Sequence, residues 1–139
     1  MKILFDTNVI LDVMLLREPF FQFSTLLLAK VERKNIEGYI CSTTVTTIHY
    51  LYSKFKSNQE AKEQIKRLLQ IFKVSQVDKI TLVSALESKF SDYEDSVLYE
   101  SALREGLDGI VTRNSKDFRF SKIPVYDPEE LLKLIIPKK

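Results

Sequence analysis

Residues 2–12, with the sequence KILFDTNVILD, decide how this chain begins to fold. The apolar run that ends at Phe5 is typical of a strand buried on both faces of a sheet. The run stops at Asp6, and residues 9–14 continue as an almost entirely apolar helix. Asp6 therefore stands at the carboxyl end of a strand, where parallel α/β sheets bind their ligands. Taken alone, it is either the cap of that helix or an acid of an active site, because Asp is also a favoured N-cap.

The composition is that of an ordinary globular chain, with 45% apolar and 29% charged residues among 139. This length predicts one domain spanning residues 1–139. A net charge of +2 gives no support to bulk electrostatic binding of nucleic acid, but it permits a local basic patch. No apolar run approaches the roughly 20 residues of a membrane span. The amino end reads as a strand rather than a signal peptide, and the single Cys41 cannot form an internal disulfide, so we expect a cytoplasmic protein.

Strands and helices alternate along the rest of the chain. Further strands are predicted at residues 39–41, 73–77, 109–112 and 123–126, the last at a sheet edge because it contains a proline. The helices between them include residues 20–34, 79–90 and 91–105, and a final helix is expected to run to about residue 136. This alternation predicts an α/β fold, a three-layer α/β/α sandwich around a mostly parallel sheet of four or five strands.

A second group of acids opens the predicted helix at residues 91–105, where Ser91 to Glu94 form a capping box with Ser91 as the cap. Asp95 shares a stripe with the apolar residues at 98, 99 and 102, so its side chain should point inward. Asp92 lies on the same side of the helix. Favourable interaction with the helix dipole explains an acid at position 92 well, but an inward acid at position 95 poorly.

A third group follows the predicted strand at residues 109–112. Asn114 and Asp117 stand in the polar loop after it, near the sheet edge where Asp6 also lies. Loop polarity alone is the alternative explanation for these two residues. Taken together, the three places put acids on one rim of the sheet. Clustered carboxylates repel one another, and their hard oxygen ligands suit Mg²⁺ or Mn²⁺ rather than zinc.

These three segments, in this order and spacing, resemble the PIN-domain family over nearly the whole chain. The segments are the opening strand ending in Asp6, the acidic helix start at residues 92–95, and residues 110–118. The resemblance implies a fold of the type predicted above and a metal-dependent ribonuclease that hydrolyses RNA phosphodiester bonds. Many members of this family are toxins of bacterial toxin–antitoxin pairs, so an antitoxin protein is an expected partner beside the RNA substrate.

The resemblance also implies roles for individual residues. Asp6 and Asp95 are expected to be catalytic metal-site acids, with Asp92 and Asp117 as further ligands of Mg²⁺ or Mn²⁺. The last acidic position falls on Asn114 or Asp117, since both alignments of the motif are acceptable. Residues next to these acids are expected to contact the substrate: Thr7, Asn8, Thr112 and Arg113.

One departure from the family favours a second interpretation. PIN domains usually carry a Glu on the helix after the second strand, but no Glu occurs between Thr43 and Phe55, and His49 or a neighbour stands in its place. The alternative is therefore a PIN fold of weak or lost activity that serves as a binding module for RNA or protein. A haloacid-dehalogenase-like phosphatase is disfavoured because Asn8 stands where it needs a second Asp. Surplus apolar residues in the first two helices suit a homodimer or an antitoxin interface.

Overall fold

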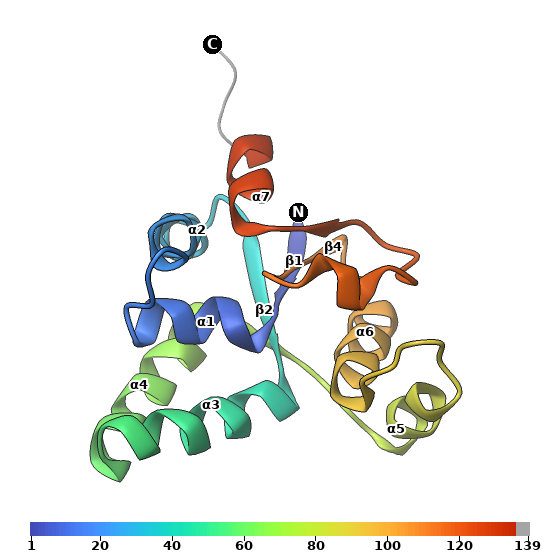
Figure 1. Ribbon diagram of the computed structural model, residues 1–139, viewed down its shortest axis with the longest axis horizontal. Helices are drawn as coiled ribbons and strands as arrows, with labels where there is room; N and C mark the ends of the chain where they lie inside the picture. The colour runs from blue at the N-terminus through green and yellow to red at the C-terminus, as the bar shows by residue number, and fades with distance from the viewer. Residues whose placement is uncertain (136–139) are drawn as a thin grey trace.

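The computed structural model describes residues 1–135, in which helices flank a five-stranded sheet (Figure 1). The strands are β1 (Lys2–Phe5), β2 (Glu37–Cys41), β3 (Lys73–Ser75), β4 (Gly109–Val111) and β5 (Val125–Tyr126). The helices are α1 (Thr7–Met14), α2 (Phe21–Glu32), α3 (Ser42–Phe55), α4 (Asn58–Ile71), α5 (Lys79–Leu86), α6 (Tyr93–Glu105) and α7 (Pro128–Ile135), with a short 3₁₀ helix η1 (Ser115–Phe118). The predicted end of the last helix at residue 136 lies outside the described residues.

The sheet has the order β3-β2-β1-β4-β5, and every neighbouring pair of strands is parallel. The chain builds outward from β1 to β3, then returns to the other side of β1 with β4 and β5. This reversal places a topological switch point between β1 and β4, where open α/β sheets bind ligands beyond the strands' carboxyl ends. The predicted parallel α/β fold is confirmed, and β5 is an edge strand, as predicted from Pro124, which comes directly before it rather than within it.

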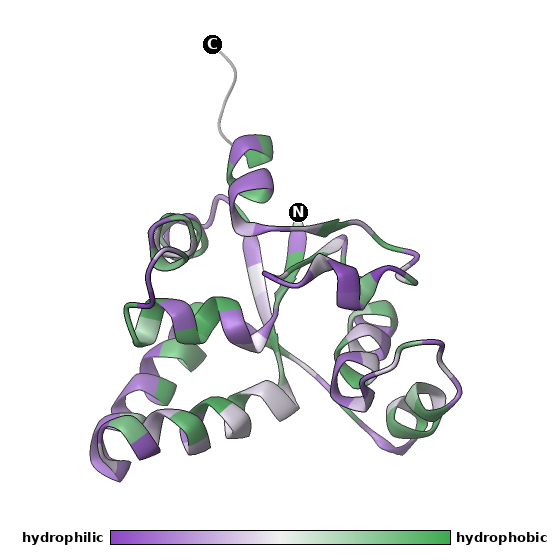
Figure 2. Cartoon of the chain, in the orientation of Figure 1, coloured by the Kyte–Doolittle hydropathy of each residue, from purple (hydrophilic) through white to green (hydrophobic). Residues whose placement is uncertain are grey.

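Two hydrophobic cores cover the two faces of the sheet. In β1, Ile3 and Phe5 pack into the core formed with α1, α2, α3, α4 and α7, whereas Leu4 faces the core formed with α6 and η1. Figure 1 shows α1 to α4 on one side of the sheet and α5 and α6 on the other. Figure 2 shows hydrophobic residues along most helices interrupted by hydrophilic ones, as expected for helices with one buried face. The three layers of the predicted sandwich are therefore present.

Gly38 allows close packing at the middle of the sheet. A Cβ atom at this position of β2 would meet the Phe72 ring at 2.7 Å and Cγ1 of Val31 at 2.8 Å. Contacts this short require the neighbours to move, so the absence of a side chain lets the ends of α2 and α4 lie directly against the strand.

Local signals located most helix starts correctly. Asp6 caps α1, and the hydroxyl of Ser57 accepts the Glu60 N–H at the start of α4. The prediction that Ser91 caps α6 was wrong, because Asp92 is the N-cap and its Oδ1 accepts the Asp95 N–H at 2.9 Å. Helix α5 ends at residue 86 rather than 90. Within residues 1–135, no helix has the length and apolar character required to cross a membrane.

Candidate functional site

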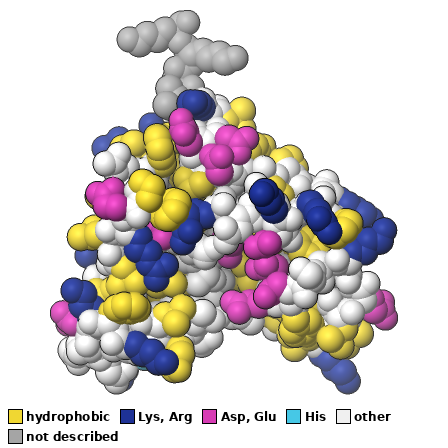
Figure 3. All heavy atoms as spheres, viewed as in Figure 1, with side chains coloured by type: hydrophobic (Ala, Val, Ile, Leu, Met, Phe, Trp, Pro, Cys, Tyr) yellow, Lys and Arg dark blue, Asp and Glu magenta, His cyan; other side chains and the backbone are white. Residues whose placement is uncertain are grey.

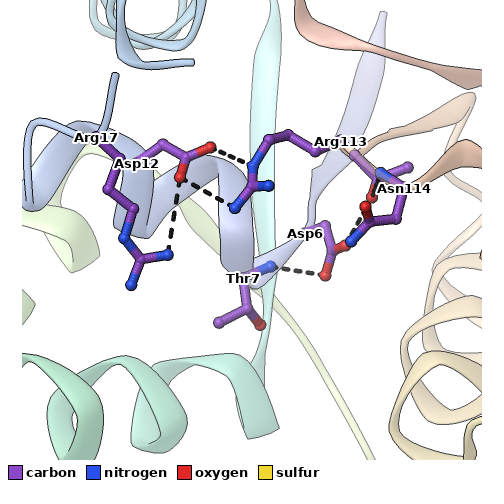
Figure 4. A network of polar contacts seen from close by, with 7 residues as sticks. Asp6, Thr7, Asp12, Arg17, Arg113 and Asn114 are labelled. Carbon is purple, nitrogen blue, oxygen red and sulfur yellow. Dashed lines mark hydrogen bonds and ion pairs between the residues drawn. The ribbon is translucent and has the colours of Figure 1, made fainter. Parts of the chain in front are cut away.

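Asp6 lies at the switch point and is held there from both sides. Its N–H donates to the Val111 carbonyl at 3.0 Å, which joins the ends of β1 and β4. Asp6 is only 6% exposed, and its carboxylate accepts the Thr7 N–H on Oδ1 at 2.8 Å and the Thr112 hydroxyl on Oδ2 at 2.7 Å. Figure 4 shows the Thr7 bond and, beside it, Asn114, whose N–H donates to the Thr112 hydroxyl at 3.0 Å. Asp6 is therefore a helix cap and also a fixed acid at the edge where ligands bind.

Helix α6 brings a second set of acids to this edge. The helix leads directly into β4, so it runs antiparallel to the strands and its amino-terminal end lies at their carboxyl ends. Asp95, in its first turn, is half-buried, as its predicted inward orientation requires. Burial, followed by the charge of Asp6, raises the pKa of the Asp95 carboxyl to about 7. Figure 3 shows acidic side chains gathered at the middle of this face, with Lys and Arg on either side.

Burial also raises the pKa of the Asp6 carboxyl above its usual value. The Thr112 hydroxyl and the Thr7 N–H oppose this rise, because both donate hydrogen bonds to the charged form. The negative charges of two other acids, Glu94 and Asp117, raise the pKa of the Asp6 carboxyl and that of the Asp95 carboxyl. The acids thus lie within electrostatic range of one another, as the sequence predicted for Asp6, Asp95 and Asp117.

Sequence reasoning missed Glu94. It was assigned to a capping box with Ser91, but Asp92 is the cap, so Glu94 needs another explanation. Its side chain is exposed and its charge acts on both Asp6 and Asp95. The signal available in the sequence was its direct adjacency to Asp95 in the first turn of the same helix.

The loop after β4 separates the two candidates for the last acidic position. Asn114 precedes η1, donates its backbone N–H to the Thr112 hydroxyl, and lines a cavity whose lining does not include Asp6, Asp95 or Asp117. Asp117 lies within η1, is exposed, and adds negative charge to Asp6 and Asp95. Of the two, Asp117 is the one whose charge is coupled to the other acids.

The donor set fits a hard divalent cation. Carboxylate oxygens predominate at this edge. A divalent cation such as Mg²⁺ or Mn²⁺, which prefers oxygen ligands, would offset the repulsion between their charges. Within residues 1–135, however, no three Asp, Glu, His or Cys side chains are arranged so that they could already hold a metal ion. The acids are therefore brought near one another by the fold without being assembled into a closed ligand shell. Asp92, predicted as a ligand, uses one carboxylate oxygen to cap α6.

Arg113 is engaged in an internal ion pair. Its Nε and Nη2 donate to the two carboxylate oxygens of Asp12 at 2.6 and 3.3 Å, and Arg17 approaches the same carboxylate at 3.8 Å (Figure 4). Asp12 is completely buried in α1. Arg113, which the sequence predicts to contact substrate, is therefore bound within the protein and its side chain is 23% exposed. Asp12 itself gave no functional signal in the sequence.

The first turn of α3 reaches the site through a hydroxyl. The buried Thr7 and Thr44 place their hydroxyl oxygens 3.2 Å apart. Asn8, predicted to contact substrate, is partly exposed in the first turn of α1. His49 lies further along α3 and is partly exposed. Helix α3 contains no Asp or Glu, so it approaches the candidate site with the Thr44 hydroxyl rather than with a carboxylate.

Comparison with known proteins gives the family. The family described as "PIN domain" matches residues 2–116 of this chain. The chain belongs to the PIN domain family. Among curated proteins, this PIN domain is 27% identical to Ribonuclease VapC1 of Aquifex aeolicus over 134 residues, which covers 93% of this chain and 92% of that protein.

Solved structures share the fold of this PIN domain. VapBC2 from Rickettsia felis, bound to a DNA fragment from its promoter, gives a TM-score of 0.68 at 17% identity, over 91% of this chain and 98% of that one. A toxin–antitoxin complex from Klebsiella pneumoniae gives 0.67 at 22% identity, over 90% and 96%. At such identities the likeness shows the fold alone, and it confirms the predicted PIN-like α/β architecture.

Proposed function

We propose that this PIN domain is a Mg²⁺- or Mn²⁺-dependent endoribonuclease and the toxin of a toxin–antitoxin pair. The observation that carries the proposal is the buried carboxylate of Asp6, fixed by Thr112 and Thr7 at the switch point and surrounded by the charges of Asp95, Glu94 and Asp117. The name of the Aquifex aeolicus relative supports ribonuclease activity, and the Klebsiella pneumoniae complex supports an antitoxin partner.

In this mechanism Asp6 and Asp95 would hold the metal, with Asp117, Asp92 and Glu94 as supplementary acids. A divalent cation held there would supply Lewis-acid chemistry, lowering the pKa of an attacking water and stabilising charge on the leaving oxygen of the phosphodiester. Thr112 orients the Asp6 carboxylate through its short hydrogen bond, so that one oxygen keeps a fixed direction. Asn8 and the exposed part of Arg113 border the acids and contact the RNA.

Basic side chains next to Asp117 could bind the phosphate backbone of the RNA. Lys89, Lys116 and Arg119 line a cavity of about 190 Å³ that also includes Asp117. Cations in this position would bind phosphates of a single strand that crosses η1. They form the local basic patch that a net charge of +2 allows.

The experiment is cleavage of a labelled single-stranded RNA in the presence of Mn²⁺. Wild type should cut the RNA, and excess EDTA or the substitution Asp6→Asn should abolish cutting. The matched control is Asp108→Asn, which changes an exposed acid beside Lys2 at the opposite edge of the sheet and should cut normally. Undiminished cleavage in EDTA or in Asp6→Asn would rule out this mechanism.

A binding module of weak or lost activity is the second candidate, favoured by the absence of a Glu on α3. It predicts RNA or protein binding without cleavage in the same assay. Exposed apolar side chains of the α1–α3 half, Leu16 at 67% and Phe55 at 66%, offer a surface for an antitoxin or a second copy of the chain. Light scattering of the purified chain would show whether it forms the expected homodimer, and fractionation of cells would test the cytoplasmic location.

A further inference from the structure

An open cavity of about 460 Å³ is bordered by Arg113 and Asn114, the two residues that follow Thr112, whose hydroxyl donates to Asp6. Phe20, Phe23 and Pro19 line one wall, Arg113 and Asn114 a second, and residues 127–129 at the start of α7 a third. We call it the Phe20 cavity. Its volume is in the range of roughly 300–1,000 Å³ that is usual for small-molecule sites.

Flat groups line two walls of the Phe20 cavity. The rings of Phe20 and Phe23 are 40% and 38% exposed, which is high for Phe. The guanidinium carbon of Arg113 lies 4.1 Å from the centre of the Phe20 ring. Asp12 fixes that guanidinium by two hydrogen bonds, so the stacked pair is held in place before any ligand binds.

The Phe20 cavity is connected to the candidate catalytic acid by two hydrogen bonds. Asn114, in its wall, donates its N–H to the Thr112 hydroxyl, and Thr112 donates to Asp6. A part of the RNA bound in the cavity would therefore lie next to the phosphodiester that is cut at Asp6. The lysines and arginine near Asp117 lie on the other flank of the same loop, which gives a single strand cations on both sides of the acids.

We propose that the Phe20 cavity binds an unpaired nucleobase of the RNA, adjacent to the phosphodiester that is cut. This inference rests on the proposed ribonuclease function. Aromatic rings and guanidinium planes are the groups on which proteins stack bases of single-stranded RNA. The acidic wall formed by Asp127 and Glu129 disfavours a phosphate deep in the cavity, while carboxylates can accept hydrogen bonds from base amino groups. The base therefore enters the cavity and the sugar–phosphate backbone stays at its rim.

The test is a scan of a short fluorescent single-stranded RNA in which each nucleotide in turn is made abasic. Binding is measured by anisotropy in EDTA, so that the RNA stays intact. For wild type, one abasic position should weaken binding by about fivefold or more, the effect of losing one stacked base. In Phe20→Leu that same position should matter by less than about twofold. The matched control is Tyr50→Leu, an exposed ring on α3 that also has a cation above it, Lys54 Nζ at 4.3 Å from its centre, and it should keep the wild-type pattern.

The outcomes separate the two proposals. If wild type cuts the RNA with Mn²⁺ but no abasic position weakens binding, or if Phe20→Leu keeps the full effect, the base site is overturned while the ribonuclease stands. If wild type neither binds nor cuts RNA, the proposed function itself fails. NMR shifts at Phe20 with N-acetyltryptophanamide, but not with nucleoside monophosphates, would also overturn the proposal and assign the cavity to a protein side chain.

Discussion

The completely buried carboxylate of Asp12 accepts two hydrogen bonds from Arg113, whose side chain comes from the loop after β4. The two residues are 101 positions apart in the chain. Their ion pair joins α1 to the loop that carries Asn114 and Asp117. It therefore holds two of the candidate site residues at a fixed distance from α1, which follows Asp6 directly.

Removing the charge of Asp12 should destabilise the fold. Asp12→Asn keeps the shape of the side chain but leaves Arg113 without its counter-ion, and the expected cost is about 3 kcal/mol, the lower end for a buried pair that loses one partner. Urea denaturation measures this change. The exposed Glu37–Lys73 pair provides the control, since Glu37→Gln should leave the midpoint almost unchanged. An Asp12→Asn protein as stable as wild type would mean that Arg113 is adequately hydrated without the pair.

Thr112→Val should weaken metal binding. The substitution removes the hydroxyl that orients Asp6 and leaves a buried carboxylate oxygen unpaired, so we expect about 10- to 100-fold lower Mn²⁺ affinity. The free energy of unfolding should also fall by about 1–3 kcal/mol. Calorimetric titration with Mn²⁺ measures the first effect. Thr112→Ser retains the hydroxyl and should bind Mn²⁺ like wild type; equal affinities for all three proteins would contradict the role assigned to Thr112.

The raised pKa of Asp95 should make metal-free stability depend on pH. With a pKa of about 7 in the folded state against 3.8 in a free carboxyl, the folded chain binds more protons than the unfolded chain between these values. Stability therefore falls as the pH rises through this window. Asp95→Asn removes this contribution, so its melting temperature should exceed that of wild type by more at pH 7.5 than at pH 4.5.

Added Mn²⁺ should reverse this order, because only wild type keeps the full set of acids that binds the cation. Melting curves of both proteins at the two pH values, with and without Mn²⁺, measure the effect. Asp108→Asn serves as the control for an exposed acid at the far edge of the sheet. If Asp95 were only a favourable acid at a helix start, its removal should destabilise by about 0.3–1 kcal/mol with or without metal.

Substitutions in the loop after β4 should show that Asp117, not Asn114, completes the acidic group. The charge of Asp117 contributes to the raised pKa of Asp95, so Asp117→Asn should lower the pKa of the Asp95 carboxyl towards its usual value. Asn114→Ser removes no charge and should leave it unchanged. NMR titration of the Asp95 carboxyl carbon gives both values without any activity assay. A shift in Asn114→Ser alone would assign the position to residue 114.

The sequence by itself determined the order of the elements and the place of the principal acid. The apolar run before Asp6 predicted a buried strand, and the proline of the 123–126 segment predicted an edge strand. Both signals are local properties of the chain, so the sequence alone contains them. The helix starts at Ser57 and Asp78 are likewise local, since Ser57 accepts the Glu60 N–H and Asp78 accepts the Thr81 N–H, both only three residues away. The alternation of these elements was sufficient to predict a parallel sheet in three layers.

Only the tertiary structure decided which side chains meet. The bond from Thr112 to Asp6 spans 106 positions, and it forms because β1 and β4 are adjacent and in register, Phe5 beside Val111. Glu94 became part of the acidic group because the fold brings the first turn of α6 to the end of β1, where the charge of Glu94 acts on both Asp6 and Asp95. Such contacts depend on strand order and helix rotation, which arise from the whole core at once and leave no local pattern in the sequence.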